Sequence, residues 1–190
     1  MRKIIAALVM SVDGFIEGPN GELDWIQTRE DPFDLFAQID TCILGRRMYP
    51  GYEQFWRAIL ANPEGISPFI GRVPSQGEIG YARFADRTPH IVLSKTLDQV
   101  TWKNTRIVRD IAEIREMKQQ PGMDIYAVGG ATLVSSLMNL GLIDELRLVV
   151  APIVLGAGKA LFKDVTQRYV LKLLGTKSLE SGMVRLDYST

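Results

Sequence analysis

Three short segments carry glycine, hydroxyl and basic side chains at points where an apolar run of the sequence ends. They consist of Gly45, Arg46 and Arg47; of Ser94 and Lys95; and of Val128, Gly129, Gly130, Ala131 and Thr132. Glycine has no Cβ, so its backbone can turn sharply and approach a ligand closely. Guanidinium and ammonium groups bind phosphate oxygens. These residue types at these positions therefore indicate a phosphate-bearing ligand.

The glycine pair lies where one periodicity changes to another. Residues 124–129 have the pattern of a strand, and residues 131–140 have helical spacing up to Gly141. The first amides of such a helix point outward, and the helix macrodipole favours an anion there. The pair is not the six-residue dinucleotide fingerprint, however, and a tight turn without a ligand explains it equally well.

The other two segments favour the ligand. The strands predicted at 41–45 and 90–94 end at Gly45 and Ser94, and a basic residue directly follows each. Alone, each basic residue is explained as a solvated surface charge. Together, the three strand ends favour a phosphate site, whose basic side chains suit the 2′-phosphate that distinguishes NADPH from NADH.

Strands alternate with helices along most of the chain. Apolar runs predict strands at 3–11, 41–45, 90–94, 105–109 and 142–156, and helical spacing predicts helices at 31–40, 110–120 and 131–140, a broken helical stretch at 46–56 and a helical turn at 78–85. Residues 169–189 alternate apolar and polar side chains, as antiparallel strands do. The sequence therefore predicts an α/β sandwich whose central sheet is mostly parallel, with antiparallel C-terminal strands.

Composition excludes several classes of protein. The 190 residues fit one domain spanning 1–190, and 22 basic residues balance 22 acidic ones, so no positive field gathers nucleic acid. Cys42 and His90 are the single cysteine and the single histidine, too few for a disulfide or the usual zinc site. No apolar stretch is long enough to span a bilayer. We expect a cytoplasmic protein with no metal and no nucleic-acid or membrane partner, in which His90 is structural.

Five segments together resemble one known family. They are "MSVDGFIEGPNGELDW", "LGRRMY", "HIVLSKTL", "DIYAVGGATLVSSLMNLGLIDELRL" and "PIVLGAGKALF", in this order. They are similar to the dihydrofolate-reductase-like superfamily, and specifically to the reductase domain of the bacterial riboflavin-biosynthesis deaminase-reductase. The resemblance implies a dihydrofolate-reductase-like three-layer sandwich that binds NADPH and commonly works as a homodimer.

The resemblance also implies roles for the three segments. Gly45, Arg46 and Arg47 would lie along the adenosine and phosphate side of NADPH, and Ser94 and Lys95 would meet its 2′-phosphoadenosine end. The pyrophosphate would bind the backbone amides of Val128, Gly129, Gly130, Ala131 and Thr132.

On the substrate side, the loop at 12–18 would border the nicotinamide, which places Val12 and Phe15 there. Asp13 is the candidate catalytic group, although an Asp-Gly turn also explains it. Trp25 and Tyr49 could wall a flat heterocycle or serve as core aromatics. Asp34 corresponds to the substrate-binding acid on the first long helix of dihydrofolate reductases, and an acid in the first helical turn explains it too.

The preferred hypothesis is an NADPH-dependent reductase of a small, pterin-like or ribosylaminopyrimidine-like heterocycle. In such enzymes the cofactor supplies the hydride and the protein supplies orientation. Alternatives are a non-catalytic nucleotide-binding or interaction protein on the same scaffold, and a true dihydrofolate reductase. Deaminase activity is not expected, because the chain lacks the zinc ligands that it requires.

Overall fold

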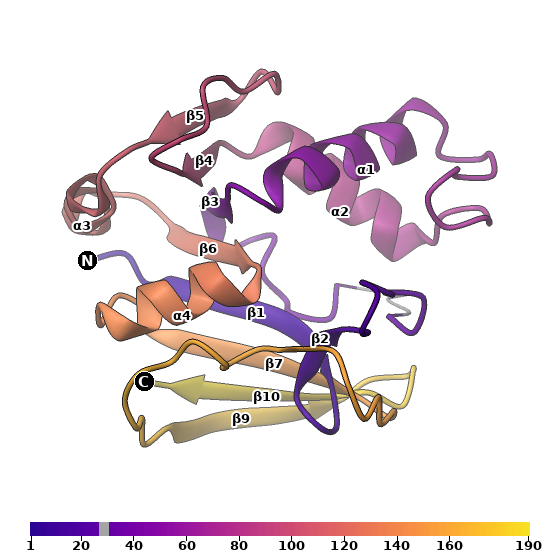
Figure 1. Ribbon diagram of the computed structural model, residues 1–190. Helices are drawn as coiled ribbons and strands as arrows, with labels where there is room; N and C mark the ends of the chain where they lie inside the picture. Colours follow the sequence, from indigo (N-terminus) through magenta and orange to yellow (C-terminus); the bar gives the residue numbers. More distant parts are fainter. Residues whose placement is uncertain (27–30) are drawn as a thin grey trace.

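The computed structural model describes residues 1–26 and 31–190. The described part contains, in chain order, β1 (Ile4–Ser11), β2 (Phe15–Glu17), β3 (Ile39–Gly45), α1 (Tyr49–Ala61), α2 (Gln76–Arg87), β4 (His90–Leu93), β5 (Thr105–Val108), α3 (Ile111–Gln119), β6 (Asp124–Gly129), α4 (Ala131–Asn139), β7 (Glu145–Ala151), β8 (Lys159–Ala160), β9 (Lys172–Ser178) and β10 (Val184–Ser189). Figure 1 shows their arrangement.

Eight strands form one sheet in the order β5-β4-β3-β6-β1-β7-β10-β9. The six strands from β5 to β7 are parallel, and β10 and β9 join antiparallel at one edge. β2 and β8 make a separate two-stranded ribbon. The predicted mostly parallel α/β fold with antiparallel C-terminal strands is therefore confirmed. Because six strands share one direction, their carboxyl ends lie along one edge of the sheet.

Helices cover both faces of the central strands of the sheet. On β1, Ile4, Ala6 and Leu8 belong to the core beneath α3 and α4, and Ile5, Ala7 and Val9 belong to the core beneath α1 and α2. Successive side chains of a strand point to opposite faces, so a strand buried on both sides reads as a continuous apolar run. Figure 1 shows α4 against one face of β6 and β1. The result is a three-layer sandwich.

The helix predicted at 31–40 is absent, which is a correction. The Asp31 carboxylate accepts the amides of Phe33 (3.0 Å) and Leu35 (2.9 Å), as a helix cap would, but no helix follows. Asp34 has a φ of 52°, which breaks the helical path. Phe33 and Leu35, the residues directly before and after Asp34, are both buried against the sheet. Tertiary packing of two alternate apolar residues thus overrides the local helical pattern.

A second correction concerns the broken helix predicted at 46–56. Pro50 and Gly51 do not interrupt α1, because Pro50 stands in its first turn, where a missing N–H costs nothing. The helical turn predicted at 78–85 is part of the longer helix α2. Ser75 begins α2 with a capping box: its hydroxyl accepts the Glu78 amide, and the Glu78 carboxylate accepts the Ser75 amide.

The side chains of His90 and Cys42 lie in the core on the α1 and α2 side of the sheet. The His90 ring stacks on Trp102 with centroids 4.9 Å apart, and its Nε2 lies 3.4 Å from the Tyr52 hydroxyl. Burial lowers the pKa of His90 to about 4 and raises the pKa of the Cys42 thiol. His90 is therefore neutral at physiological pH and has a structural position, as predicted.

The described residues also bear on metals and membranes. No group of three or more His, Cys, Asp or Glu side chains among residues 1–26 and 31–190 is arranged to hold a metal ion. In the same part of the chain, no helix has the length and apolar character to cross a membrane.

Candidate functional site

Gly45 and Gly129 meet at the carboxyl edge of the sheet. β3 and β6 are neighbours, and Leu44 pairs with Gly129 at a register shift. A Cβ on Gly45 would lie 3.8 Å from the Gly129 carbonyl oxygen, and one on Gly129 would lie 3.1 Å from Leu8 Cδ2. Gly129 has a φ of +118°, a conformation that L side chains rarely adopt. The structure therefore needs glycine at position 129 even without a ligand.

Gly130 begins α4 and has a different environment. Its φ of −84° and ψ of −158° are extended, and it provides no side-chain cap for the helix. A Cβ there would meet only Ile16 Cδ1, at 3.9 Å. The peptide bond between Gly129 and Gly130 is cis. The first amides of α4, including those of Ala131 and Thr132, thus start at an uncapped helix end that favours an anion.

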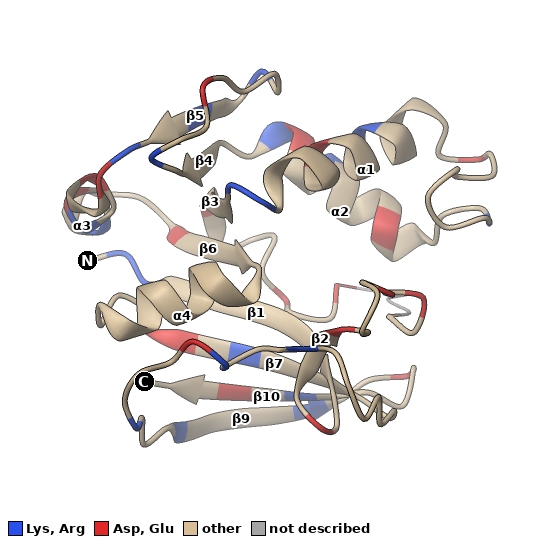
Figure 2. Cartoon of the chain, viewed as in Figure 1, with Lys and Arg blue, Asp and Glu red and all other residues tan. Residues whose placement is uncertain are grey.

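Arg46, Arg47 and Lys95 are exposed at the same edge. Arg46 and Arg47 lie in the turn between β3 and α1, where Figure 2 shows a basic stretch, and Lys95 follows β4. Within residues 1–26 and 31–190 none of the three side chains has an ion-pair or hydrogen-bond partner. β3 and β4 are adjacent parallel strands. The structure therefore places the three predicted basic residues on neighbouring strand ends, free to bind an anion.

Ser94 shapes the turn that carries Lys95. Its hydroxyl oxygen accepts the amides of Thr96 (3.2 Å) and Leu97 (2.9 Å), and its side chain is buried. A hydroxyl that accepts two hydrogen bonds still has its own proton to donate. Ser94 is thus fixed in place and keeps one donor for a ligand.

Sequence reasoning missed Arg109, which directly follows β5. Its Nη1 donates to the Ser94 carbonyl oxygen over 3.0 Å, so Arg109 belongs to the same edge as Lys95. The signal was present in the sequence, because the predicted strand at 105–109 ends in this arginine just as the other strands end beside Arg46 and Lys95.

The loop at 12–18 lies beside the glycine pair. A Cβ on Gly130 would meet Ile16 Cδ1 at 3.9 Å, and the Val12 amide donates to the Ile153 carbonyl oxygen over 2.9 Å. Phe15 pairs with Ala160 in the ribbon of β2 and β8. The loop thus lies next to the residues predicted to bind the cofactor.

The Asp13 carboxylate joins this loop to the segment at 153–158. It accepts the amides of Leu155 (3.1 Å) and Gly156 (2.7 Å). A hydrogen bond from Ser11, and then these amides, lower the pKa of Asp13 below the ordinary aspartate value. Asp13 is therefore ionised at neutral pH. The geometry gives it a role in holding two loops together, and its catalytic role stays a prediction.

The two candidate aromatic residues have internal contacts. Trp25 is half-buried and donates its indole N–H to the Glu22 carbonyl oxygen over 3.1 Å. Tyr49 is 4% exposed, and its hydroxyl oxygen accepts the amides of Thr101 (2.9 Å) and Trp102 (3.1 Å). The Tyr49 ring thus belongs to the core beneath α1 and α2, and its substrate contact stays a prediction.

Asp34 does not lie on a helix, so the comparison with a substrate-binding acid on the first long helix does not hold here. Its Oδ2 lies 2.6 Å from Arg185 Nη1 and 3.4 Å from Lys177 Nζ. The bond from Arg185 is the largest cause that lowers the pKa of Asp34. Asp34 therefore fastens the 31–38 segment to β10 and β9 as an ionised carboxylate.

We expect Asp34→Asn to lower the free energy of unfolding by about 0.5–1 kcal/mol, because the carboxylate is half-exposed and its ion pairs are screened by solvent. NADPH affinity should not change. Urea unfolding and calorimetric titration measure the two quantities. Loss of NADPH affinity with unchanged stability would instead place Asp34 in the binding site.

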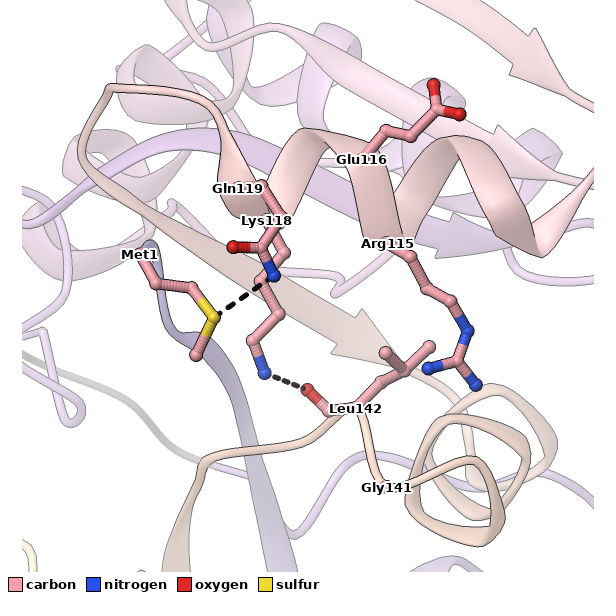
Figure 3. A pocket seen from close by; sticks show the side chains of 7 residues that line it. All are labelled: Met1, Arg115, Glu116, Lys118, Gln119, Gly141 and Leu142. Carbon is pink, nitrogen blue, oxygen red and sulfur yellow. Dashed lines mark hydrogen bonds between the residues drawn. The ribbon is translucent and has the colours of Figure 1, made fainter.

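A shallow hollow of about 410 Å³ lies elsewhere. Its lining residues come from the chain start, the end of α3 and the approach to β7: Met1, Arg115, Glu116, Lys118, Gln119, Gly141 and Leu142. Figure 3 shows Lys118 Nζ donating to the Leu142 carbonyl oxygen (3.1 Å) and Gln119 donating to the Met1 sulfur (3.2 Å). Because β1 and β7 begin here, the hollow is at the amino edge of the sheet, away from the predicted cofactor residues.

Comparison with known proteins extends over the whole fold. The family model of the RibD C-terminal domain matches residues 2–185. The uncharacterized protein YyaP of Bacillus subtilis is 36% identical over 190 residues, covering 98% of this chain and 94% of that protein. A Shewanella sp. PV-4 protein ascribed to riboflavin biosynthesis superposes with a TM-score of 0.71 at 19% identity, covering 98% of each chain. Dihydrofolate reductase from Enterococcus faecalis, complexed with NADP(H), superposes with a TM-score of 0.65 at 15% identity, covering 98% of this chain and 95% of that one.

Proposed function

The chain belongs to the RibD C-terminal domain family, and from that premise we propose that it is an NADPH-dependent reductase of a small nitrogen heterocycle. The family supports a reductase-type function. The choice of NADPH and of the substrate class is the proposal, and the following contacts support it.

The observation that carries the proposal is the meeting of Gly45, Gly129 and Gly130 beside basic side chains with no partner among the described residues. The close approach of β3 and β6 leaves a backbone edge without side chains, which suits a pyrophosphate. Arg46 and Arg47 stand where a guanidinium fork can bind a phosphate monoester. This combination suits a dinucleotide with an additional phosphate.

NADPH would supply the hydride, and this chain would bind and orient it. The amides at the start of α4 would hold the pyrophosphate, and Arg46, Arg47, Ser94 and Lys95 would hold the adenosine end. The loop at 12–18 would then cover the reactive end and exclude water. In this proposal Asp13 holds the covering loops together. It does not donate a proton at neutral pH, because its lowered pKa keeps it ionised.

Calorimetric titration of the purified protein tests the proposal. We expect saturable binding of NADPH, tighter than that of NADH, and oxidation of NADPH at 340 nm in a screen of pterins, flavins and aminopyrimidines. A protein that binds neither nucleotide would contradict the assignment. We also propose that the protein is a single-domain, cytoplasmic homodimer. Light scattering, which measures the mass of the particle in solution, tests the dimer.

A second candidate is a non-catalytic nucleotide-binding protein. The specific observation in its favour is that Asp13, the candidate catalytic acid, is ionised and hydrogen-bonded to Leu155 and Gly156. This candidate predicts NADPH binding without turnover of any compound in the screen. A true dihydrofolate reductase finds less support, because Asp34 is held by Arg185 on β10.

Replacing Arg46 and Arg47 together by alanine should weaken NADPH more than NADH. Loss of a charge-assisted contact to the 2′-phosphate costs about 1–3 kcal/mol, which is roughly 5-fold to 150-fold in affinity. The exposed Arg83 on α2 provides the control, since Arg83→Ala should leave both affinities unchanged. An equal loss for the two nucleotides would show that the arginines do not read the 2′-phosphate.

A further inference from the structure

The hydrogen-bond ladder between β1 and β6 stops before either strand ends. β1 pairs with β6 only as far as Ala6, whereas its pairing with β7 continues to Ser11. β6 stays with β3 instead, and a register shift in that ladder brings Gly129 opposite Leu44. Such irregularities are common beside active sites. A gap in the ladder thus opens toward the carboxyl edge of the sheet, next to the glycine pair.

The phase of β1 decides which backbone groups face this gap. The Lys3 carbonyl oxygen accepts the Ile125 amide over 2.8 Å, and strand residues alternate, so Ala7 and Val9 also turn their backbone groups toward β6. A continued ladder would pair the Ala7 carbonyl with the Gly129 amide, but the pairing has ended there. Within the described strands, Val9 has no partner on β6 either. Val9 therefore offers one donor and one acceptor side by side in the gap.

The Tyr126 hydroxyl takes the place of the missing amide. Tyr126 lies on β6 opposite Ile5, and its hydroxyl donates to the Ala7 carbonyl oxygen over 3.0 Å. The Tyr126 residue is 3% exposed, and a buried carbonyl without a partner would cost stability. A ladder would hold the two strands about 4.8 Å apart. A hydroxyl on a side chain satisfies the Ala7 carbonyl without that close approach of the backbones.

Two further tyrosines support this hydroxyl. Tyr81 on α2 is a hydrogen-bond partner of Tyr126. The Tyr81 and Tyr52 hydroxyls lie 3.1 Å apart, and His90 Nε2 lies 3.4 Å from the Tyr52 hydroxyl. Burial raises the pKa of all three tyrosines, so each keeps its proton at neutral pH. A chain of hydroxyls thus extends from the core beneath α1 and α2 to the gap, and Tyr126 is its last donor.

The free backbone groups of Val9 match one chemical group of the proposed cofactor. A primary carboxamide has a carbonyl acceptor and an N–H donor, so it can bind one strand residue much as a neighbouring strand does. Nicotinamide bears such a group, and the gap lies beside the amides proposed to bind the pyrophosphate. The apolar side chains of Leu8 and Ile16 border the glycine pair, which suits the flat ring.

We propose that Tyr126 is a positioning residue for the nicotinamide. By holding the Ala7 carbonyl, its hydroxyl keeps β1 and β6 apart and leaves the Val9 N–H and C=O free for the carboxamide. This inference rests on the proposed reductase function. Because Tyr126 is almost fully buried, it acts through β1 and not by contact with the cofactor.

Tyr126→Phe tests this role with two ligands. NADPH contains the nicotinamide half of the cofactor, and 2′,5′-ADP contains only its adenosine and phosphate half. Loss of the hydroxyl leaves a buried carbonyl without its donor, so β1 has to shift to find another. Calorimetry should show NADPH binding weakened by about 10-fold and 2′,5′-ADP binding unchanged.

An analogue without the amide N–H identifies the contact. In the reduced 3-acetylpyridine analogue of NADPH, a methyl group replaces the NH₂ of the carboxamide. The unmodified protein should bind NADPH about 10-fold more tightly than this analogue, because the Val9 carbonyl oxygen loses its donor. In Tyr126→Phe this preference should fall to about 2-fold or less. A side chain that only stabilises the fold would leave the preference unchanged.

Tyr169→Phe is the matched control. The Tyr169 hydroxyl also donates to a backbone carbonyl oxygen, that of Met138, but this bond lies at the end of α4 that is remote from the glycine pair. Its loss should lower the temperature of thermal unfolding without changing the affinity for NADPH, for its analogue or for 2′,5′-ADP.

An equal loss of NADPH and 2′,5′-ADP affinity in a folded Tyr126→Phe variant, or no change in either, would overturn the inference. If thermal unfolding shows that this variant does not fold, Tyr81→Phe decides. Tyr81 is half-buried, and loss of its supporting hydroxyl should weaken NADPH alone by about 3-fold. Unchanged NADPH affinity there would also overturn the inference. Absence of NADPH binding by the unmodified protein would instead contradict the proposed function.

Discussion

Replacing Gly130 by valine is expected to weaken NADPH binding by about 100-fold, or about 2.7 kcal/mol, in a protein that still folds. The backbone at Gly130 is extended, a conformation open to valine, and its Cβ would meet only Ile16 Cδ1 at 3.9 Å. The folded protein therefore has room for a Cβ at position 130. A pyrophosphate bound to the amides at the start of α4 would leave no such room, because the valine side chain would occupy the space through which the phosphate approaches the backbone.

Gly51→Ala is a matched control for this variant. A Cβ at Gly51 on α1 meets nothing within 4 Å, so NADPH affinity should be unchanged. Gly129→Ala is unsuitable as a binding probe. The φ of +118° at position 129 and the contact of a Cβ with Leu8 would make this substitution lower the stability of the protein even without a ligand. Calorimetry measures affinity, and thermal unfolding checks the fold. If Gly130→Val binds NADPH as the unmodified protein does, the glycine serves only the turn.

Acidification should destabilise the protein well above the pH at which most carboxylates titrate. His90 has a pKa of about 4 in the folded state against about 6.5 in an unfolded chain. As pH falls below 6.5 the unfolded chain binds a proton that the folded protein refuses, so the free energy of unfolding falls. The full loss is about 3 kcal/mol at pH 4, of which about 2 kcal/mol is lost between pH 6.5 and 5. Above about pH 7.5 this contribution is complete and constant.

His90→Gln isolates this effect, because His90 is the only histidine in the chain. The variant should be less stable at pH 7, owing to the lost packing on Trp102, but its stability should change little between pH 6.5 and 5. Carboxylates with lowered pKa values, such as Asp13 and Asp34, lose their contribution only at lower pH. Urea unfolding at several pH values measures the slopes. Parallel slopes for the two proteins would contradict the assignment to His90.

Local pattern predicted the elements that have one dominant signal. The structure confirms the strand predicted from the continuous apolar run of β1 and the helices predicted from the spacing of α3 and α4. It also confirms the strands predicted from the alternation in β9 and β10. Gly141, expected to end a helix, has a φ of +63° just after α4. Parallel pairing also followed from the alternation of strands and helices, and this placed Gly45, Ser94 and Gly129 on one edge.

Pattern failed where a distant contact decides the local structure. Residues 31–38 have an N-cap and helical spacing, yet Arg185 holds Asp34 from more than a hundred residues away and Phe33 and Leu35 pack on the sheet. Arg109 ends a predicted strand, but only the neighbouring β4 brings it to Ser94.

β6 lies between β1 and β3, although it follows both by many residues. A chain emerging from the ribosome therefore contains both N-terminal strands long before it contains the strand that joins them. Before β6 is made the proposed cofactor edge is incomplete, because Gly45 of β3 can pair with Leu93 of β4 but lacks Gly129 and Gly130 beside it. Such non-local pairing is typical of slow folding. A fragment ending before Asp124 should bind no NADPH, and it should expose the apolar strand surface that β6 covers in the whole protein.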